Sequence, residues 1–340
     1  MNPSVGIIVM NRNQAAYTRD CLASLRAVDY STFRTLVVDN GSEDSSLQEV
    51  AGAFPEVDFL WIKENLGVAG GRNAGIRHLI PLSPEYVLFL DNDTFVAPDF
   101  LSRLVAQMQR DPRIGAVQPK IYFAEPPNGI CSVGGRLYPR ISYYRHPGSG
   151  QIESTKLEGA TEIDIVSGCA GLMRATVFRN VGLLDETFSP YCHEDVDWSL
   201  RLRKAGYRLV LEPSAIVWHR VSGSPKVNPD KLAKLVKGHT LFLRFHTRIV
   251  DLPLSVAWIS IHLLRRFILP ALVRSDWASF AAVFKGIREG IEQKRIPIEV
   301  VPEFLCTPSA LNRTNGTASA VLEVDCKPNS ANLEAPVSHH

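Results

Sequence analysis

The sequence lacks several features that would place it in a specialised class of proteins. Its 340 residues carry a formal net charge of only +2, so there is no general excess of basic side chains with which to bind nucleic acid. Its six cysteines lie far apart and none forms a CxxC pair, which argues against a zinc site and against a disulfide scaffold. We therefore expect reduced thiols, as in a cytosolic protein.

Signals for export or for crossing a membrane are also missing. The opening residues, MNPSVGIIVM, contain no basic segment and run directly into strand-like sequence, which predicts that they are not a signal peptide. The longest apolar stretch without a charge, Leu252 to Leu264, has 13 residues. About 20 are needed to span a bilayer, so we expect a cytoplasmic protein without a membrane-spanning helix.

The residues that are present suit a globular protein with an uneven distribution of charge. Hydrophobic residues make up 45% of the chain and charged residues 21%, which is enough for an ordinary core. Residues 231–295 hold twelve lysines and arginines against four acidic residues, a net charge of +8, whereas residues 1–230 have a net charge of −3. This contrast suggests an acidic main body and a basic module that faces an anionic partner such as a membrane surface.

Short β-branched runs alternate with helical patterns over the first hundred residues. Strands are expected at Val5–Met10, Thr35–Val38, Asp58–Ile62 and Tyr86–Leu90, and helices at Ala16–Ala27 and Gly71–Leu79. The alternation predicts βαβ units and a mostly parallel sheet with helices on both faces. In such sheets ligands bind beyond the carboxyl ends of the strands, so the polar residues at those ends are the candidates for a site.

The second half of the chain divides into three parts. Residues 120–165 predict loops and short strands, and they are followed by helices at Arg174–Val181 and Val196–Ala205 and a strand at Arg208–Leu211. The expected organisation is a Rossmann-like α/β domain over residues 1–224, a basic amphipathic helical module over 225–304, and a disordered tail rich in Ser, Asn, Thr, Ala and Pro over 305–340.

One candidate metal site follows the apolar strand at Tyr86–Leu90. The strand ends in Asp91-Asn92-Asp93, and the side-chain period of two turns both aspartates toward the same side. Two carboxylates so placed can share a hard divalent cation that also takes oxygens from a diphosphate. The alternative is a turn followed by a helix cap, because Asp and Asn favour both.

Two further segments could contact a nucleotide. Asp39 ends a buried strand and could accept hydrogen bonds from a base or a ribose hydroxyl, although the residues after it also read as ordinary turn chemistry. In KENLGVAGGRNAGI, residues 63–76, the glycines permit close backbone approach, and Arg72 and Asn73 open a helix where recognition of a phosphate or a base is easy. Taken alone, each of these segments is weak evidence.

Two motifs near residue 200 are ambiguous by themselves. His193-Glu194-Asp195 stands where a helix begins, and acidic residues there usually act as caps and as partners of the helix dipole. His219 follows a strand, and a lone histidine is more often structural than a metal ligand.

Read together, these segments resemble a known family of enzymes. The chain carries, in order, VVDNGS, the pattern N-x-G-x-A-x-G-R-N-x-G, LDND, SGCAGLMRATVFRNVGLLDETF, EDVDWSLRLRKAGY and VWHRVSGS. This series is similar to the family 2 glycosyltransferases, which have the GT-A fold, and to their rhamnosyltransferase-like branch. The resemblance covers about residues 4–224, and these motifs, in the family's order and spacing, together outweigh the structural alternative for each one.

The resemblance implies catalytic roles. Asp91 and Asp93 match the family's motif for a metal ion and a diphosphate, and His219 matches a further metal ligand. Asp195 matches the general base that deprotonates the acceptor hydroxyl, with Glu194 beside it. We therefore expect Asp93 and His219 to meet at one divalent ion, Mn²⁺ or Mg²⁺.

The resemblance also implies a donor pocket. Asp39 and Arg72 match positions that hold the nucleoside, Asn65 lies at the edge of the same pocket, and Asn11 and Asn92 complete the expected donor-binding set. Two positions depart from the family pattern. The first strand ends in NRN where a tyrosine is usual at the centre, and His193 replaces an aromatic or apolar residue, which is expected to alter the acceptor site.

The helical module has two apolar faces. Leu254–Leu269 is apolar nearly all round, apart from a thin stripe formed by Ser255, His262 and Arg266. A second pattern places Trp277, Phe280, Phe284, Ile287 and Ile291 at helical spacing. Packing onto the catalytic domain or in a homo-oligomer, and binding to an anionic membrane on the cytoplasmic side, are both open interpretations.

The expected activity is therefore an inverting, metal-dependent glycosyl transfer. The donor is a nucleotide sugar, dTDP-rhamnose first and a UDP-sugar second, and the acceptor is a cell-surface polysaccharide or a lipid-linked saccharide. A sugar-phosphate nucleotidyltransferase would need a Gly-rich basic loop directly after the first strand, and MNRNQAAY does not supply one. A non-catalytic saccharide-binding scaffold is expected to have lost Asp93, Asp195 or His219, and all three are present.

Overall fold

A central sheet organises the protein, whose computed structural model describes residues 2–153, 157, 159–190, 192–220 and 228–301. Eight strands follow one another across the sheet in the order β10 (Thr161–Ile163), β12 (Arg208–His219), β6 (Ile114–Phe123), β11 (Ala170–Arg174), β4 (Tyr86–Asp91), β1 (Val5–Asn11), β2 (Phe33–Asn40) and β3 (Asp58–Ile62). In the described residues two short strands extend it, β5 (Thr94–Val96) beside β12 and β7 (Ile130–Ser132) beside β6.

The sheet is parallel in one half and mixed in the other. β3, β2, β1 and β4 run parallel, as the alternating sequence predicts. β11 then runs antiparallel between β4 and β6, and β6 and β12 form a second parallel pair. The register places Asn11 opposite Asp39, and Met10 opposite Asp91, so the polar carboxyl ends of three strands coincide. This coincidence builds one edge of the candidate site.

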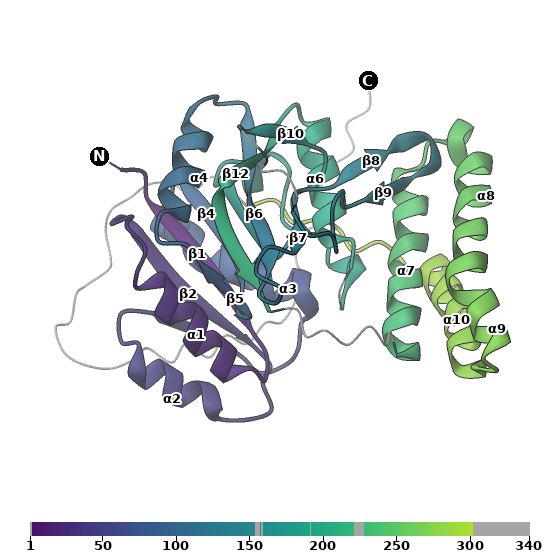
Figure 1. Cartoon of the computed structure of the whole chain (residues 1–340), viewed down its shortest axis with the longest axis horizontal. Helices are drawn as coiled ribbons and strands as arrows, with labels where there is room; N and C mark the ends of the chain where they lie inside the picture. Colours follow the sequence, from purple (N-terminus) through teal and green to yellow (C-terminus); the bar gives the residue numbers. More distant parts are fainter. Residues whose placement is uncertain (1, 154–156, 158, 191, 221–227, 302–340) are drawn as a thin grey trace, which may run out of the picture.

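Helices cover both faces of the sheet (Figure 1). On one face lie α1 (Ala15–Leu25), α2 (Ser46–Ala53) and α4 (Phe100–Gln109), whose apolar residues share a core with β1 and β4. On the other lie α3 (Gly67–Leu79), α5 (Val177–Asn180) and α6 (Glu194–Lys204), which share the second core. The expected fold class, an α/β sheet covered on both sides, is confirmed, although α2, α4 and β11 were not among the expected elements.

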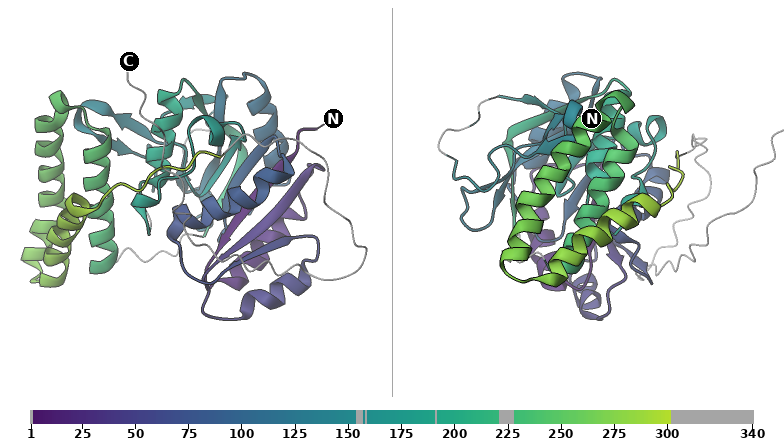
Figure 2. Two further views of the ribbon diagram at one scale, coloured as in Figure 1. Left: turned by 180° about the vertical axis from the view of Figure 1, so that it is seen from behind. Right: turned by 90° about the vertical axis from the view of Figure 1, so that its right-hand side faces the viewer.

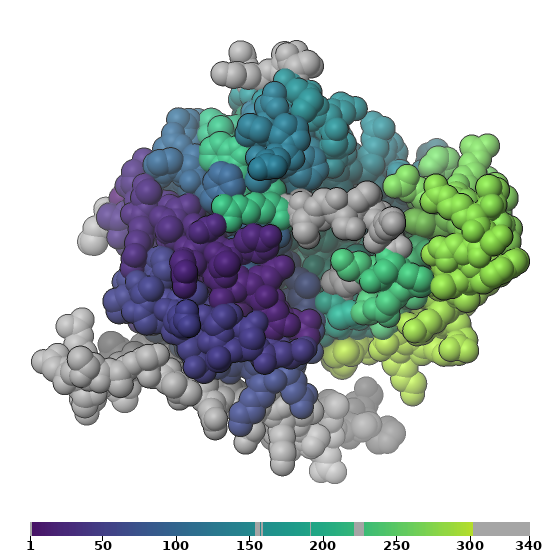
Figure 3. Space-filling model, turned by 60° about the horizontal axis from the view of Figure 1, so that its bottom comes forward, coloured from purple at the N-terminus to yellow at the C-terminus, as the bar shows by residue number. Residues whose placement is uncertain are grey.

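Beyond the sheet, four helices form one end of the molecule (Figure 2 and Figure 3). They are α7 (Pro229–His246), α8 (Leu252–Leu263), α9 (Leu269–Val273) and α10 (Trp277–Glu292). We call them the C-terminal layer. Its own small core joins α7, α8 and α10 through Val236, Leu263 and Val283. Leu241 and Phe242 of α7 pack against Phe188 and the start of α6, so the layer contacts the helix that carries Glu194 and Asp195.

A small hairpin also reaches the C-terminal layer. β8 (Arg136–Tyr138) and β9 (Tyr143–Arg145) pair outside the main sheet and extend toward α8 (Figure 1). The ring of Tyr143 lies 5.7 Å from that of Trp258, and Ser255 Oγ donates to the carbonyl of Arg140 at 3.2 Å. The described short strands agree with the loops and short strands expected over residues 120–165.

The apolar segment of the C-terminal layer is longer than the sequence analysis expects. Residues Ile249–Val273 form a helical run of 25 residues with a mean hydropathy of 1.6, and only 17% of its most apolar window is buried. The uncharged stretch stops at Arg265, but the helical run continues past Arg265 and Arg266 through a π-helical turn at Leu264–Ile268. By length and composition alone it can cross a membrane, which corrects the expectation that the layer is too short. The expected boundary at residue 224 and the tail over 305–340 lie outside the described residues.

Candidate active site

Two side chains from distant parts of the chain meet beside the end of β4. His219 Nε2 lies 3.0 Å from Asp93 Oδ1. The contact follows from the sheet, because His219, the last residue of β12, pairs with Thr94 of β5, and Arg220 N donates to the carbonyl of Asp93 at 2.8 Å. The structure therefore brings together the two residues that the sequence analysis expects at one ion.

His219 also belongs to a group of three possible metal ligands in the described residues. One ligand atom each from Asp91, Cys169 and His219 lies within 4.8 Å of the other two. Burial lowers the pKa of His219, but Cys169 and the hydrogen bond to Asp93 raise it above its ordinary value. Carboxylate oxygen, imidazole nitrogen and sulfur are all donors for divalent metals, so these residues fit such an ion.

Arg72 lies among the carboxylates and not beside Asp39. Its side chain is 3% exposed. Nη2 donates to Asp91 Oδ1 at 2.9 Å and to the carbonyl of Gly168 at 2.7 Å, and Nη1 lies 3.5 Å from Glu194 Oε1. The guanidinium thus lies between Asp91 and Glu194, and the expected nucleoside role stays a prediction. Nε and Nη1 of Arg72 have no hydrogen-bond partner.

Gly168 connects the two ends of the cluster. Its carbonyl accepts from Arg72, and its N–H donates to Asp195 Oδ2 at 3.0 Å. A Cβ atom at this position would lie 2.5 Å from Arg72 Nη1. Glycine at this position therefore lets the backbone lie close to the guanidinium without displacing it.

The two acidic residues at the start of α6 differ in their surroundings. Asp195 is fixed by backbone donors, because Oδ1 accepts from Val196 N at 2.8 Å and Oδ2 accepts from Gly168 N. Glu194 is buried, and its Oε2 has no hydrogen-bond partner. Burial and the adjacent Asp195 raise the pKa of Glu194 to about 7, although Arg72 opposes the shift. One carboxylate is thus held in a set orientation, and the other is close to protonation at neutral pH.

A cavity of about 380 Å³ joins these groups. Asp91, Arg72, Gly168, Glu194 and Asp195 line it, together with Tyr144 and His146. Tyr144, Gly168 and Cys169 were not among the expected site residues. Cys169 and Gly168 stand inside a quoted motif, so their position gave a signal, whereas nothing in the sequence around Tyr144 distinguishes it from other tyrosines in that loop-rich region.

The remaining donor-side residues form a hydrogen-bonded group at the ends of β1 and β2. Asn11 Nδ2 donates to Asp39 Oδ1 at 3.1 Å, and Ser42 Oγ also donates to Asp39. Asn92 Nδ2 donates to Asn11 Oδ1 at 3.1 Å and to Thr18 Oγ1 at 3.0 Å. Asn92 is therefore turned into the body of the protein, where it positions Asn11 and has no free side-chain donor directed at a ligand.

Asn65 stabilises the turn at the start of α3. Its Oδ1 accepts from Gly67 N at 2.9 Å and from Asn40 Nδ2 at 3.2 Å, at the start of α3. Asn40 also donates to the carbonyl of Gly67 and accepts from Leu66 N, so it ties the end of β2 to α3. Asn65 and Asn40 fix the glycine-rich turn that places Arg72.

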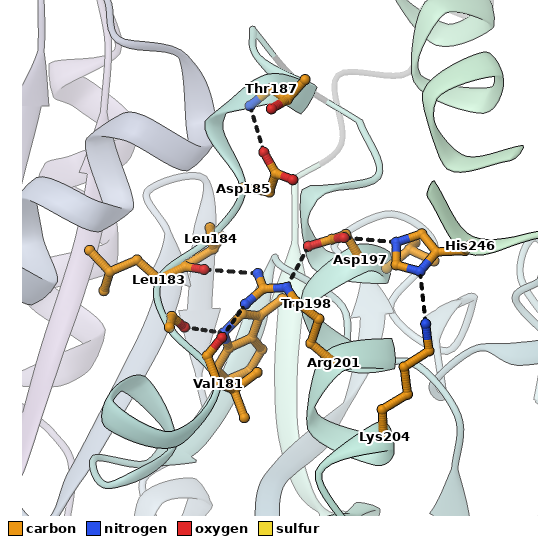
Figure 4. A network of polar contacts seen from close by, with 12 residues as sticks. Val181, Leu183, Leu184, Asp185, Thr187, Asp197, Trp198, Arg201, Lys204 and His246 are labelled. Carbon is orange, nitrogen blue, oxygen red and sulfur yellow. Dashed lines mark hydrogen bonds and ion pairs between the residues drawn. The ribbon is translucent and has the colours of Figure 1, made fainter. Parts of the chain in front are cut away.

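A polar network holds α6 in place (Figure 4). Asp197, whose side chain is 0% exposed, accepts from Arg201 Nε at 2.8 Å and lies 2.7 Å from His246 Nε2 of α7. Arg201 also donates to the carbonyls of Val181 and Leu183. The helix that begins with Glu194 and Asp195 is thereby fixed to the preceding loop and to the C-terminal layer.

His193 lies at the junction with the C-terminal layer. It has φ = 74°, is buried, and has no hydrogen-bond partner at either ring nitrogen. Its ring centroid is 4.4 Å from that of His239 on α7, and a Cβ at Gly238 would lie 2.6 Å from His193 Nδ1. Burial and His239 hold the pKa of His193 well below its ordinary value. The residue expected to alter the acceptor site therefore packs at the inner end of the cavity.

Comparison with known proteins gives a consistent result. The sequence profile described as "Glycosyl transferase family 2" matches residues 4–182. A poly-beta-1,6-N-acetyl-D-glucosamine synthase of Staphylococcus aureus (strain COL) is 28% identical over 244 residues, which is 68% of this chain and 54% of that protein. The chain thus spans about half the length of this relative.

Two further proteins match over most of their own length. An N-acetylglucosaminyl-diphospho-decaprenol L-rhamnosyltransferase of Mycobacterium tuberculosis is 28% identical over 72% of this chain and 85% of that protein. The crystallised mannosyltransferase of Pyrobaculum calidifontis, in complex with GDP-Man and Mn²⁺, superposes with a TM-score of 0.54 at 17% identity, covering 86% of this chain and 88% of that one. The structural likeness shows a shared fold.

Proposed function

Because the chain belongs to glycosyl transferase family 2, we propose that it transfers a hexose from a nucleoside-diphosphate sugar to a saccharide hydroxyl with inversion at the anomeric carbon. One observation carries the proposal: a single cavity is lined by Asp91, Arg72 and Asp195. Inversion in one displacement needs a base on the acceptor side and positive charge on the leaving-group side. The cavity offers both within one space.

Asp195 is the base in this proposal. Both of its oxygens accept backbone hydrogen bonds, so the carboxylate is held in one orientation. A fixed carboxylate can take the proton of an acceptor hydroxyl as the new bond forms. Glu194, with its raised pKa, is suited to stay protonated or to share the proton with Asp195.

Asp91, Asp93 and His219 are the residues that would hold a divalent ion, Mn²⁺ or Mg²⁺. Their proximity supports this, as does the Mn²⁺ in the complex of the Pyrobaculum enzyme. When bound, the ion would neutralise negative charge on the leaving diphosphate. Arg72, already beside Asp91, contributes a second positive charge at the same end of the cavity.

The donor in this proposal is dTDP-rhamnose, with a UDP-sugar as the second candidate. The mycobacterial relative named as an L-rhamnosyltransferase supports the first, and the synthase of poly-N-acetylglucosamine supports the second. Asp39, held by Asn11 and Ser42 at the end of β2, is the acceptor for a base or ribose donor. The names of both relatives also support a cell-surface or lipid-linked saccharide as the acceptor.

Nucleoside diphosphate release tests the activity directly. The protein is incubated with dTDP-rhamnose, UDP-N-acetylglucosamine, UDP-glucose and GDP-mannose, each with Mn²⁺, Mg²⁺ or EDTA, in the presence of a lipid-linked saccharide. We expect dTDP release with dTDP-rhamnose that needs both the metal and the acceptor. Release from UDP-sugars alone would move the assignment to the second donor, and no release from any donor would refute the proposed activity.

We also propose that the C-terminal layer docks on the cytoplasmic face of an anionic membrane. Its helix Ile249–Val273 leaves Val256, Trp258 and Ile261 at least 40% exposed, and residues 231–295 carry a charge of +8. An apolar face beside basic side chains gains from apolar burial and from attraction to anionic lipid. Docking would bring a lipid-linked acceptor to the cavity.

Flotation of the full chain with vesicles tests this. Vesicles of phosphatidylcholine with phosphatidylglycerol should carry the protein at low salt, and vesicles of phosphatidylcholine alone should carry less, since screening and loss of charge remove the electrostatic share. Trp258→Glu with Ile261→Glu should abolish flotation. Leu82→Glu, an equally exposed apolar position on the catalytic domain, is the control and should float normally. A wild-type protein that ignores both vesicles would make the exposed face a subunit contact instead.

A further inference from the structure

A thiol stands among the residues that would hold the ion. Asp91 ends β4, His219 ends β12, and Cys169 directly precedes β11. The sulfur, the imidazole nitrogen and the carboxylate oxygen lie within 4.8 Å of one another. The group therefore combines three chemically different donors from three separate elements of the fold.

The backbone holds Cys169 at this place. β11 pairs antiparallel with β4 so that Ala170 lies opposite Leu90, and Asp91 N donates to the carbonyl of Cys169 at 2.9 Å. On its other side, Gly168 contacts Arg72 and Asp195. The sheet therefore fixes the backbone of Cys169 beside Asp91, and the thiol starts from that fixed point.

The other described cysteines do not share this position. Cys131 Sγ lies 3.7 Å from His219 Nδ1, the ring nitrogen opposite the one that contacts Asp93. Cys21 Sγ faces Thr94 Oγ1 and the backbone carbonyl of Asp91. Among the four cysteines that the structure describes, Cys169 is the one grouped with both a carboxylate and the imidazole.

A buried cysteine often serves only as a small apolar side chain. Cys169 does contact the apolar core, but its sulfur also lies within 4.8 Å of ligand atoms of Asp91 and His219, a spacing at which the three could hold one ion. Sulfur beside a carboxylate and an imidazole is a donor set suited to Zn²⁺ and Co²⁺, whereas Mg²⁺ takes oxygen ligands.

We propose that Cys169 is a ligand of the ion at this site and gives it a preference for Zn²⁺ and Co²⁺ over Mg²⁺. This inference rests on the proposed function only in assuming that Asp91 and His219 bind an ion. The thiol loses its proton to solvent when the metal–sulfur bond forms. The consequence is a nucleotide-sugar site whose affinity for thiophilic ions is set by one residue of the chain.

Cobalt spectroscopy of the metal-free enzyme tests the inference without nucleotide sugar. Visible d–d absorption reports that Co²⁺ is bound, and near-ultraviolet charge-transfer absorption reports a cobalt–sulfur bond. Wild-type protein should show both, and zinc should displace the cobalt while Mg²⁺ in large excess should not. Cys169→Ser should lose the charge-transfer band and bind Co²⁺ at least about tenfold more weakly, since even the loss of a residue that only supports a metal ligand costs about 10–100-fold.

Matched variants separate the possible results. Cys131→Ser and Cys192→Ser should keep the charge-transfer band, and Cys169→Ala should behave as Cys169→Ser, with circular dichroism confirming that each is folded. A band that survives in both folded Cys169 variants would overturn the inference. So would d–d absorption that depends on His219 but lacks any charge-transfer band, and that result would leave the proposed ion site intact. No cobalt binding at all would refute both.

Discussion

We call the edge of the sheet that carries the candidate site the catalytic edge. It buries charged side chains, whereas the C-terminal layer exposes apolar ones. At the catalytic edge, charged groups such as Arg72 and Glu194 are buried and held by other polar groups. In the layer, apolar groups such as Val273 and Trp277 are 86% and 64% exposed. A buried charge persists only where partners stabilise it, and a broad exposed apolar face in a folded protein indicates a surface that is covered in use.

The two regions differ in the partners that the structure shows for them. The charges of the catalytic edge find partners within the chain, with gaps at Arg72 and Glu194 that a substrate can fill. In the part of the chain that the structure describes, the exposed apolar face of the layer is left uncovered. The two regions nevertheless share a boundary, because His246 of the layer contacts Asp197 on the same helix as Asp195.

The largest expected effect comes from a substitution at the catalytic edge that leaves the C-terminal layer unchanged. Asp195→Asn preserves size and can still receive one of the two backbone hydrogen bonds, but an amide cannot accept the acceptor's proton. Loss of a general base costs about 10²–10⁴ in rate. Steady-state kcat should fall in that range while donor affinity and the melting temperature stay close to wild type.

Asp230→Asn, an exposed aspartate of α7, is the matched control and should keep full turnover. Near-normal kcat in Asp195→Asn would remove this residue from the role of base and direct attention to Glu194.

The next effect concerns how the free energy of unfolding depends on pH because Glu194 is buried. Its pKa of about 7 is raised above the usual 4.5, so its contribution to stability is fully present below about pH 4.5 and is lost as pH rises through 7. Glu194→Gln removes the ionisation. The variant should match wild type near pH 5 and become more stable toward pH 8, by up to about 3 kcal/mol.

Urea unfolding at a series of pH values measures this. Glu49→Gln, on the exposed surface of α2, serves as the control and should give a difference that does not change with pH. A constant difference for Glu194→Gln as well would show that burial does not govern the ionisation of this carboxyl.

The smallest effect tests the boundary between the two regions. His246→Ala removes the contact with Asp197 and leaves a fully buried carboxylate with Arg201, and at a greater distance Arg295, as its partners. Hydrogen bonds to charged groups contribute about 1.5–3 kcal/mol, so the free energy of unfolding should fall by that amount. Lys204→Ala, which removes an exposed side chain 3.5 Å from the same histidine, should change it by less than about 0.5 kcal/mol.

A single cooperative transition in His246→Ala, shifted as a whole, would show that catalytic edge and layer unfold together. Two separated transitions would instead show that the catalytic edge and the layer unfold as independent units joined by a weak contact.

Much of the parallel half of the fold could be predicted from the sequence. The strands β1, β3 and β4 have uniform apolar runs followed directly by polar residues, so both their type and their functional ends are evident. The meeting of Asp93 and His219 was expected from the family resemblance, and the structure places the two side chains 3.0 Å apart.

The antiparallel insertion could not be predicted in the same way. β11 has only five residues, begins Ala-Gly, and directly follows Ser167-Gly168-Cys169, so its short pattern carries little signal. Without that strand, nothing places Gly168 beside Arg72 or Cys169 beside Asp91. The partners of Arg72 come from residues far away in the chain, so its glycine-rich motif alone could not show which groups the guanidinium contacts.

The length of the apolar helix was also underestimated for a physical reason. Counting uncharged residues ends the segment at Arg265, but a helix backbone does not stop at an arginine, and long basic side chains can extend their charged ends toward water while their stems remain among apolar groups.

The close approach at Gly238 limits how this protein can be recombined with its relatives. Helix α7 lies so near His193 that a methyl group at Gly238 would meet the imidazole at 2.6 Å. A chimera that joined this catalytic sheet to another protein's membrane helices would therefore need a glycine at the same turn, or a smaller residue in place of His193. The absence of a side chain at Gly238 therefore decides whether a helix from another protein can pack beside His193, the residue that precedes Glu194 and Asp195.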